Sequence, residues 1–81
     1  MKQVRYDRAA LRALYRHRNM RRRIEEKLAA YATDPASMTN VVKRLTTGDL
    51  RLRVGDFRVI FRETPGHIDV LDLGPRGDIY E

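Results

Sequence analysis

The sequence contains no cysteine and few of the other side chains that carry out common enzyme chemistry. Without cysteine, neither a disulfide framework nor a thiolate metal site can form, which fits a reducing cytoplasm. The two histidines, His17 and His67, stand far apart, so we expect no metal site. Ser37 is the one serine of the chain and has no histidine at a suggestive spacing. These absences argue against a metalloenzyme and against a catalytic serine triad.

Long apolar runs are missing as well. No stretch approaches the ~20 apolar residues that a membrane span needs. Residues 1–4 do not begin the hydrophobic segment of a signal peptide. The glycines form neither kind of phosphate-cradling loop. The sequence therefore predicts a cytoplasmic protein with no membrane partner and no metal or small-molecule cofactor.

Basic residues outnumber acidic ones. The 17 lysines and arginines against 11 aspartates and glutamates give a formal net charge of +6 over 81 residues. Such an excess favours an acidic partner, which can be nucleic acid, an anionic membrane or an acidic protein. Of these we favour nucleic acid or a particle rich in it. The length predicts a single small domain that spans residues 1–81, without internal repeats or linkers.

Residues 50–62 alternate between apolar and basic side chains. Leu50, Leu52 and Val54 share one side of a predicted strand, and arginines occupy the other. Gly55-Asp56 is a tight-turn signal, and the same alternation resumes after it. The sequence therefore predicts a hairpin with one apolar face, which forms part of the core, and one arginine-lined face.

The remaining elements follow in a simple order. We predict a strand over residues 4–6, a helix over 8–16 that begins after Asp7, and a second helix that begins after Asn19 and ends before Pro35. The apolar residues of the first helix are Leu11, Leu14 and Tyr15, and those of the second are Met20, Ile24, Leu28 and Tyr31. One continuous helix is the competing interpretation, because no glycine or proline forces a break. Strands are predicted over 41–45 and 68–73, with loops at 36–40 and 74–78.

Short turns between the later strands indicate antiparallel neighbours. An N-terminal strand and a helical hairpin, packed on a small and mainly antiparallel sheet, make an α+β fold. In that fold the helices cover the apolar face of the sheet.

Two groups of basic residues are candidates for binding a polyanion. The helical group includes Arg21 and Arg22, whose alternative role is a solvated outer surface. The sheet group is more specific, because like charges opposite each other destabilise a sheet unless something neutralises them. It comprises Arg51, Arg53, Arg58 and Arg62, with Lys43 on the preceding strand and Arg76 in the last loop.

Guanidinium groups stay protonated, so they are poor acid–base catalysts but good stabilisers of phosphate charge. A tyrosine among arginines, as Tyr80 is expected to be, can have a lowered pKa and take part in proton transfer. This set fits RNA cleavage in which the ribose 2′-hydroxyl attacks the adjacent phosphate. The protein then supplies orientation and charge stabilisation, and positioning alone can contribute about 7–11 kcal/mol in favourable cases.

Residues 52–62 and 70–80 together resemble the RelE/ParE superfamily of bacterial toxins from type II toxin–antitoxin systems, and they are closer to its RelE-like branch. The first segment reads LRVGDFRVIFR and the second VLDLGPRGDIY. The order of the strand, the helical hairpin and the terminal sheet also agrees with the superfamily. RelE-like toxins cut messenger RNA in the ribosomal decoding site.

The resemblance implies roles for individual residues. Arg58 matches the arginine that stabilises the scissile phosphate, Arg76 the arginine of the last loop, and Tyr80 the C-terminal tyrosine that assists catalysis. Arg51 and Arg53 match basic positions on the preceding strand, one of which is usually a lysine with a catalytic role, and we expect Arg51 to take that role. The residues then expected to bind RNA are Arg53, Arg62, Arg21, Arg22 and Lys43. The chain departs from the pattern at Asp49, where some members carry a lysine, and at Pro75, where a histidine is common.

The resemblance also implies partners: a cognate antitoxin protein, the ribosome and mRNA. Two alternatives remain open at this point. The chain can be a ParE-like inhibitor of DNA gyrase that binds without chemistry, or an inactive member that only binds its antitoxin.

Overall fold

The computed structural model describes residues 1–77. Strand β1 (Gln3–Tyr6) leads into helix α1 (Arg8–Arg16), a 3-10 turn (Arg18–Met20) and helix α2 (Arg21–Thr33). A second 3-10 turn (Pro35–Met38) then leads to four strands: β2 (Val42–Arg44), β3 (Leu50–Val54), β4 (Phe57–Glu63) and β5 (His67–Pro75). The order of elements is the one predicted.

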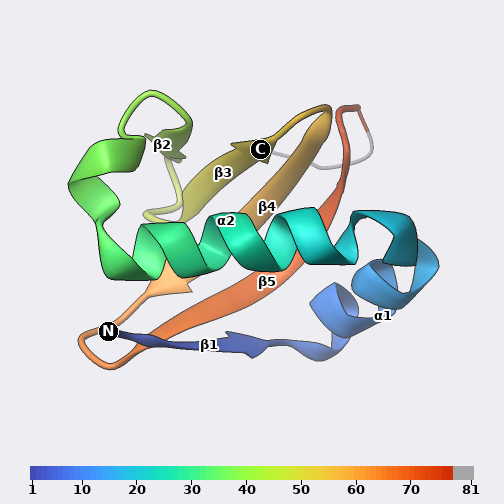
Figure 1. The fold of residues 1–81 in the computed structure, drawn as a ribbon, viewed down its shortest axis with the longest axis horizontal. Helices are drawn as coiled ribbons and strands as arrows, with labels where there is room; N and C mark the ends of the chain where they lie inside the picture. The colour runs from blue at the N-terminus through green and yellow to red at the C-terminus, as the bar shows by residue number, and fades with distance from the viewer. Residues whose placement is uncertain (78–81) are drawn as a thin grey trace.

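The strands form one sheet with the spatial order β1-β5-β4-β3-β2 (Figure 1). Strands β2 to β5 pair antiparallel with their neighbours, and β1 adds to the edge of β5 in parallel. A parallel pair requires a long crossover. Here the crossover from β1 to β5 contains both helices and the other three strands. The prediction of an α+β fold with a mainly antiparallel sheet is confirmed.

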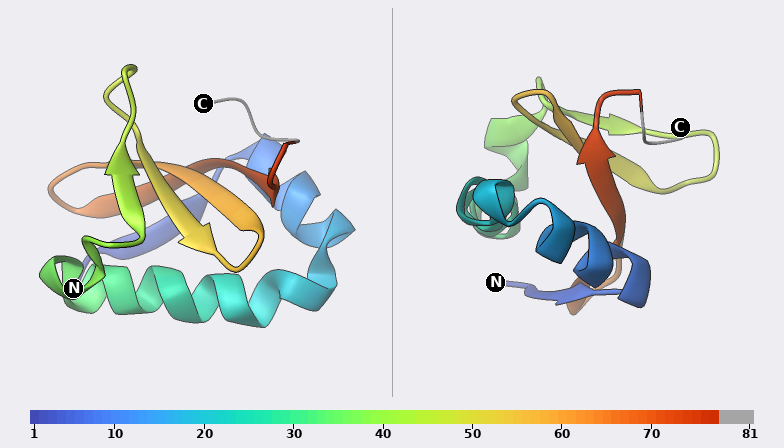
Figure 2. Two further views of the ribbon diagram at one scale, coloured as in Figure 1. Left: turned by 90° about the horizontal axis from the view of Figure 1, so that it is seen from above. Right: turned by 90° about the vertical axis from the view of Figure 1, so that its right-hand side faces the viewer.

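Both helices cover the same face of the twisted sheet, and the other face carries no helix (Figure 2). The core lies between these layers, and its largest fully buried side chains are Phe61, Ile24, Leu28 and Leu52. The predicted apolar stripe of α2 is buried throughout, and so is the apolar side of β3. None of the helices in the described part of the chain is long and apolar enough to cross a bilayer.

Helix α1 packs differently from the prediction. Its buried residues are Leu14 and two alanines, Ala10 and Ala13, whereas Leu11 is 54% exposed and Tyr15 is 75% exposed. The helix packs on β5, and small side chains on that side let it approach the strand closely. Leu11 and Tyr15 then point outward, and the guanidinium of Arg18 lies 5.7 Å from the centroid of the Tyr15 ring.

The two helices are separate, as the hairpin interpretation predicted, and the break lies at His17. The prediction that Asn19 caps α2 is wrong, because Asn19 lies inside the 3-10 turn and Met20 occupies the cap position without a side-chain hydrogen bond. The His17 ring packs edge-on against Phe57, with 5.0 Å between ring centroids. The break is thus held by contact with the start of β4.

The last strand is longer than predicted. Gly74 and Pro75, expected in a loop, continue β5 opposite Arg58 and Phe57. A proline is tolerated there because β1 pairs only with residues 67–70 of β5, so that side of Pro75 is an edge of the sheet among the described residues. Further back, Ile60 pairs with Asp72 while Phe61 pairs with Val70, so Leu71 is one extra residue on β5 and forms a bulge. The longer strand brings residue 76 beside the β3–β4 turn.

A polar network ties the N-terminus to the sheet. The Glu63 carboxylate accepts hydrogen bonds from Lys2 Nζ at 2.7 Å and from the Tyr31 hydroxyl at 2.8 Å. Burial raises the pKa of Glu63, but the hydrogen bonds from Lys2 and Tyr31 outweigh it and hold this pKa below its usual value. Burial, together with the bond to Glu63, raises the pKa of Tyr31 to about 12.

Candidate functional site

The face of the sheet that carries no helix is lined by basic side chains in cross-strand pairs. Arg53 on β3 lies directly opposite Arg58 on β4, and Lys43 on β2 lies directly opposite Arg51 on β3. Side chains alternate along a strand, so these four lie on the side away from buried Leu52. Like charges in directly opposite positions destabilise a sheet. This face therefore presents four cationic side chains to a polyanion such as nucleic acid.

Arg76 reaches the same region from the end of β5. Its backbone N–H donates to the carbonyl of Asp56 in the β3–β4 turn, at 2.7 Å. Gly74 on β5 is the register partner of Arg58 on β4. Arg76 comes two residues after Gly74 along the chain. One main-chain hydrogen bond thus fixes the loop that carries Arg76 to the turn of the hairpin.

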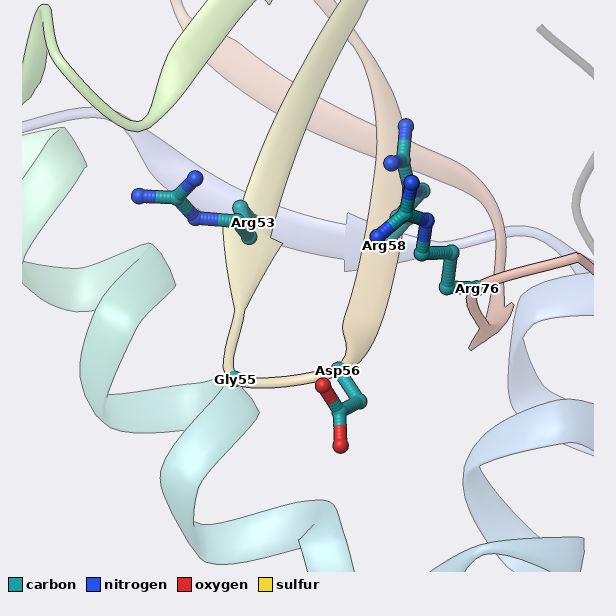
Figure 3. Close-up of a pocket in the computed structure, with 5 residues that line it drawn as sticks. All are labelled: Arg53, Gly55, Asp56, Arg58 and Arg76. Carbon is teal, nitrogen blue, oxygen red and sulfur yellow. The ribbon is translucent and has the colours of Figure 1, made fainter.

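A pocket of about 490 Å³ opens at this end of the sheet, lined by Arg53, Gly55, Asp56, Arg58 and Arg76. In Figure 3 the guanidinium of Arg76 points toward that of Arg58, while Arg53 extends in the opposite direction across β3. The Asp56 carboxylate points away from the arginines. Three guanidiniums and one carboxylate line the pocket, so it is cationic and suits an anion with several oxygens, such as a phosphate.

The site residues predicted as catalytic divide into three cases. Arg58 and Arg76 converge in the pocket. Arg51 is half-buried two register rows away, opposite Ile60, and does not line the pocket. Tyr80 lies outside the described residues. Of the residues predicted to bind RNA, Arg53 lines the pocket and Lys43 lies beside Arg51.

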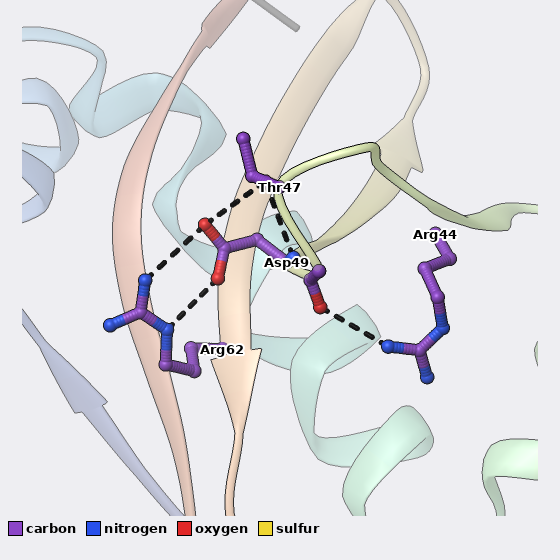
Figure 4. A network of polar contacts seen from close by, with 5 residues as sticks. Arg44, Thr47, Asp49 and Arg62 are labelled. Atoms are coloured by element: carbon purple, nitrogen blue, oxygen red, sulfur yellow. Dashed lines mark hydrogen bonds and ion pairs between the residues drawn. The ribbon is translucent and has the colours of Figure 1, made fainter.

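Arg62 lies at the other end of the basic face. Its guanidinium holds the Asp49 carboxylate through two contacts, Nε to Oδ1 at 2.9 Å and Nη2 to Oδ2 at 3.5 Å (Figure 4). The hydrogen bond to Asp49 raises the pKa of Arg62. The structure does not bring Arg62 into the pocket, and its charge is matched by a carboxylate.

Arg21 and Arg22 belong to the helical layer. Arg21 pairs with Glu25 at 3.4 Å and Arg22 pairs with Glu26 at 3.2 Å, each one helical turn away. All four side chains are largely exposed, so these pairs contribute little to stability. The structure places both arginines on α2, apart from the basic face of the sheet.

Residues 4–80 match the family described as ParE toxin of type II toxin–antitoxin system, parDE. The chain belongs to this family. Membership confirms the prediction of a toxin of the RelE/ParE superfamily. No match is found among curated protein sequences.

Two solved structures resemble this ParE-family toxin along nearly its whole length. The archaeal RelE–RelB complex from Pyrococcus horikoshii gives a TM-score of 0.72 at 24% identity, covering 96% of this chain and 98% of that chain. The toxin–antitoxin complex RelBE2 from Mycobacterium tuberculosis gives a TM-score of 0.61 at 23% identity, covering 93% and 98%. These likenesses establish the fold, and it is a RelE fold, as the resemblance implied.

Two contacts around the pocket of this toxin were not predicted from its sequence. Gly55 has a φ of +59°, and a Cβ built there would lie 2.8 Å from Nη2 of Arg23. The end of the Arg23 side chain, which comes from α2, therefore packs against the hairpin turn. Asp56 was expected only to form the turn, yet its carbonyl also anchors Arg76. Neither contact leaves a signal in the sequence, because both join segments that are far apart along the chain.

Chemically, the pocket can bind and stabilise negative charge. Neither His17 nor His67 lines it, and no group of three or more metal-ligating side chains occurs among residues 1–77. Within the described residues the pocket offers fixed positive charge, and its one carboxylate, that of Asp56, points away from the arginines.

Proposed function

We propose that this toxin is a ribosome-dependent endoribonuclease that cleaves mRNA and so inhibits translation. The observation that carries the proposal is the convergence of Arg58 and Arg76, from β4 and from the end of β5, in one cationic pocket. Two guanidiniums that approach from different strands can contact different oxygens of one phosphate. The RelE-like resemblance implies catalytic roles for these two arginines, and their placement in one pocket supports those roles.

The proposed reaction is an internal transfer within the RNA. The ribose 2′-oxygen loses its proton and forms a bond to the adjacent phosphorus, and the bond from phosphorus to the 5′-oxygen of the next nucleotide breaks. The 5′-oxygen takes up a proton, so the products are a 2′,3′-cyclic phosphate and a 5′-hydroxyl. Arg58 and Arg76 stabilise the charge that develops on the non-bridging oxygens, and Tyr80 is the proposed proton carrier.

The composition of the pocket supports the proposed dependence on the ribosome. Stabilisation by one preorganised donor typically contributes a factor of about 10²–10³ in rate. In-line placement of the 2′-oxygen must supply much of the rest, and a bound ribosome can hold mRNA in such a geometry. The pocket requires this help because its lining combines arginines with one carboxylate that points away from them.

An antitoxin is the proposed protein partner. The two similar structures are complexes of RelE with RelB and of RelBE2. A net charge of +6 on this chain favours a partner with excess acidic residues. We propose that such a partner binds the toxin and controls access to the basic face.

The test compares wild type, Arg58→Ala and Arg12→Ala, each induced in cells, with transcript 5′ ends mapped after growth arrest. Arg12 is an exposed arginine on α1 and serves as a control of equal charge change. We expect codon-phased cuts in mRNA with wild type and Arg12→Ala, and far fewer with Arg58→Ala. Arrested growth with intact mRNA would overturn the proposal, and harmless expression of wild type would favour an inactive member.

The second candidate function is inhibition of DNA gyrase. It is favoured by the family match itself, which is to the ParE toxin of the parDE system. This function predicts DNA breaks and an SOS response during arrest, with mRNA left intact. The same induced cultures distinguish the two functions when SOS reporter activity is measured alongside transcript ends.

A further inference from the structure

The Asp49–Arg62 pair joins the β2–β3 turn to the C-terminal half of β4. The Asp49 side chain is only 13% exposed, whereas that of Arg62 is 61% exposed. Thr47 Oγ1 lies within hydrogen-bond distance of both the Asp49 carboxylate, at 3.4 Å, and the Asp49 backbone N–H, at 3.3 Å (Figure 4). The Leu45 N–H donates to the Asp49 carbonyl at 2.8 Å. The carboxylate therefore sits in a fixed place, and the arginine reaches toward it.

A second carboxylate stands on the other side of Arg62. Asp69 on β5 is the register partner of both Arg62 on β4 and Arg5 on β1. Arg5 Nε contacts Asp69 Oδ1 at 2.7 Å. Charges therefore alternate across this row of the sheet, and the two arginines and two aspartates sum to zero. The described residues that line the pocket are instead three arginines, one aspartate and one glycine.

We propose that Asp49 is a specificity-determining residue that withholds Arg62 from RNA, so that the phosphate backbone is bound along Arg76, Arg58 and Arg53 and then toward Arg51 and Lys43. This inference rests on the proposed function and deepens it. It defines the path of the bound RNA over the basic face. The RNA leaves the pocket across β3 toward β2 rather than along β4 toward β1.

The effect of Asp49 does not depend on a strong ion pair. An exposed arginine–carboxylate pair is weak, so a phosphate can displace the carboxylate from Arg62. Because Asp49 is held by its own turn, its charge remains beside any phosphate that binds there. The phosphate then meets one positive and one negative group at similar distance. RNA affinity arises from neutralised phosphates and released counterions, and a neutral pair supplies neither.

The test is a double-mutant cycle on RNA binding. The probe is a fluorescein-labelled single-stranded oligoribonucleotide with 2′-O-methyl groups, which removes the nucleophile and so prevents cleavage. Anisotropy titrations from 50 to 200 mM salt are performed on wild type, Asp49→Asn, Arg62→Ala and the double variant, with Arg58→Ala as a reference for loss. Circular dichroism and thermal melting verify that each variant is folded.

We expect Asp49→Asn to bind more tightly than wild type and to steepen the slope of log K against log salt by about 0.7, the value for one additional phosphate on a single strand. Arg62→Ala leaves the Asp49 carboxylate unmatched, so it is expected to bind more weakly than wild type but to lose less than Arg58→Ala. The double variant, in which neither charge remains, is expected to bind like wild type. Arg58→Ala is expected to weaken binding and to flatten the slope.

Three results would overturn the inference. The first is that Arg62→Ala weakens binding as much as Arg58→Ala. The second is that Asp49→Asn leaves affinity and slope unchanged. The third is that none of the proteins binds the probe even at 50 mM salt. Because the probe cannot be cleaved, this assay is independent of the transcript mapping. Intact transcripts together with the expected cycle would reject the endoribonuclease but retain Asp49 as the residue that restricts RNA binding.

Discussion

The backbone N–H of Arg76 donates to the carbonyl of Asp56 at 2.7 Å. This bond joins the last loop to the β3–β4 turn, two segments that the sequence separates by 20 residues, and it sets Arg76 beside Arg58. Since the bond uses only main-chain atoms, the position of residue 76 does not depend on its side chain. Position and chemistry at this residue can therefore be separated by mutation.

We predict that Arg76→Ala leaves stability within about 0.5 kcal/mol of wild type, as is usual for exposed surface positions, but strongly reduces cleavage of ribosome-bound mRNA. Arg76→Pro removes the N–H donor and is expected to lower stability by about 1 kcal/mol, the worth of one hydrogen bond. Urea denaturation and a cleavage assay on both variants test this. Equal activity of Arg76→Ala and wild type would show that the guanidinium has no catalytic role.

The hairpin turn offers a second prediction, on stability alone. Gly55 has a left-handed φ of +59°, and an added Cβ would lie 2.8 Å from Arg23 Nη2. Gly55→Ala should lower the free energy of unfolding by about 1–2 kcal/mol, chiefly through the left-handed backbone. The arginine end can move aside, so adding Arg23→Ala should restore little of that loss.

Gly66→Ala is the matched control for this change. Gly66 lies in the β4–β5 turn without a left-handed φ, and an added Cβ there meets no atom within 4 Å. It should leave the urea midpoint close to that of wild type or raise it slightly, because alanine narrows the unfolded ensemble. Equal midpoints for Gly55→Ala and Gly66→Ala would contradict the role assigned to the turn.

Glu63 gives a prediction about pH. Its pKa is lower in the fold than in the unfolded chain, because the bonds from Lys2 and Tyr31 outweigh burial. A lowered pKa stabilises the fold above the unfolded value, near 4.5, and this stabilisation is lost as pH falls through the folded value. Glu63→Gln should therefore be less stable than wild type at pH 7, and the difference should shrink on acidification below about pH 4.5. Thermal melts at pH 7, 5 and 3 test this, and a constant difference would contradict it.

Much of this fold could be predicted because its signals are local. The alternation in residues 50–62 set the faces of β3 and β4, and the spacing of Ile24, Leu28 and Tyr31 set the buried side of α2. The prediction failed where tertiary contacts decide. Ala10 and Ala13 face the sheet in place of Leu11 and Tyr15, because close approach to β5 favours small residues over large apolar ones.

The candidate site was predictable in composition but not in arrangement. Counting alternate positions places Arg53 and Arg58 on one face, yet it places Arg62 there equally well. Only the structure shows that the turn before β3 presents Asp49 to Arg62. The predicted loop at residues 74–75 is strand instead, and this extension delivers Arg76 to the pocket. Both features depend on pairing between strands, which no single segment encodes.

The most direct test of the central claim is single-turnover cleavage of mRNA on purified ribosomes by wild type, Arg58→Ala and Arg12→Ala, with thermal melts of each. The proposed site predicts that Arg58→Ala is slower by about 10²–10³-fold at unchanged melting temperature, and that Arg12→Ala cuts at the wild-type rate. Cleavage by Arg58→Ala at the wild-type rate, or no cleavage by the folded wild type, would contradict it.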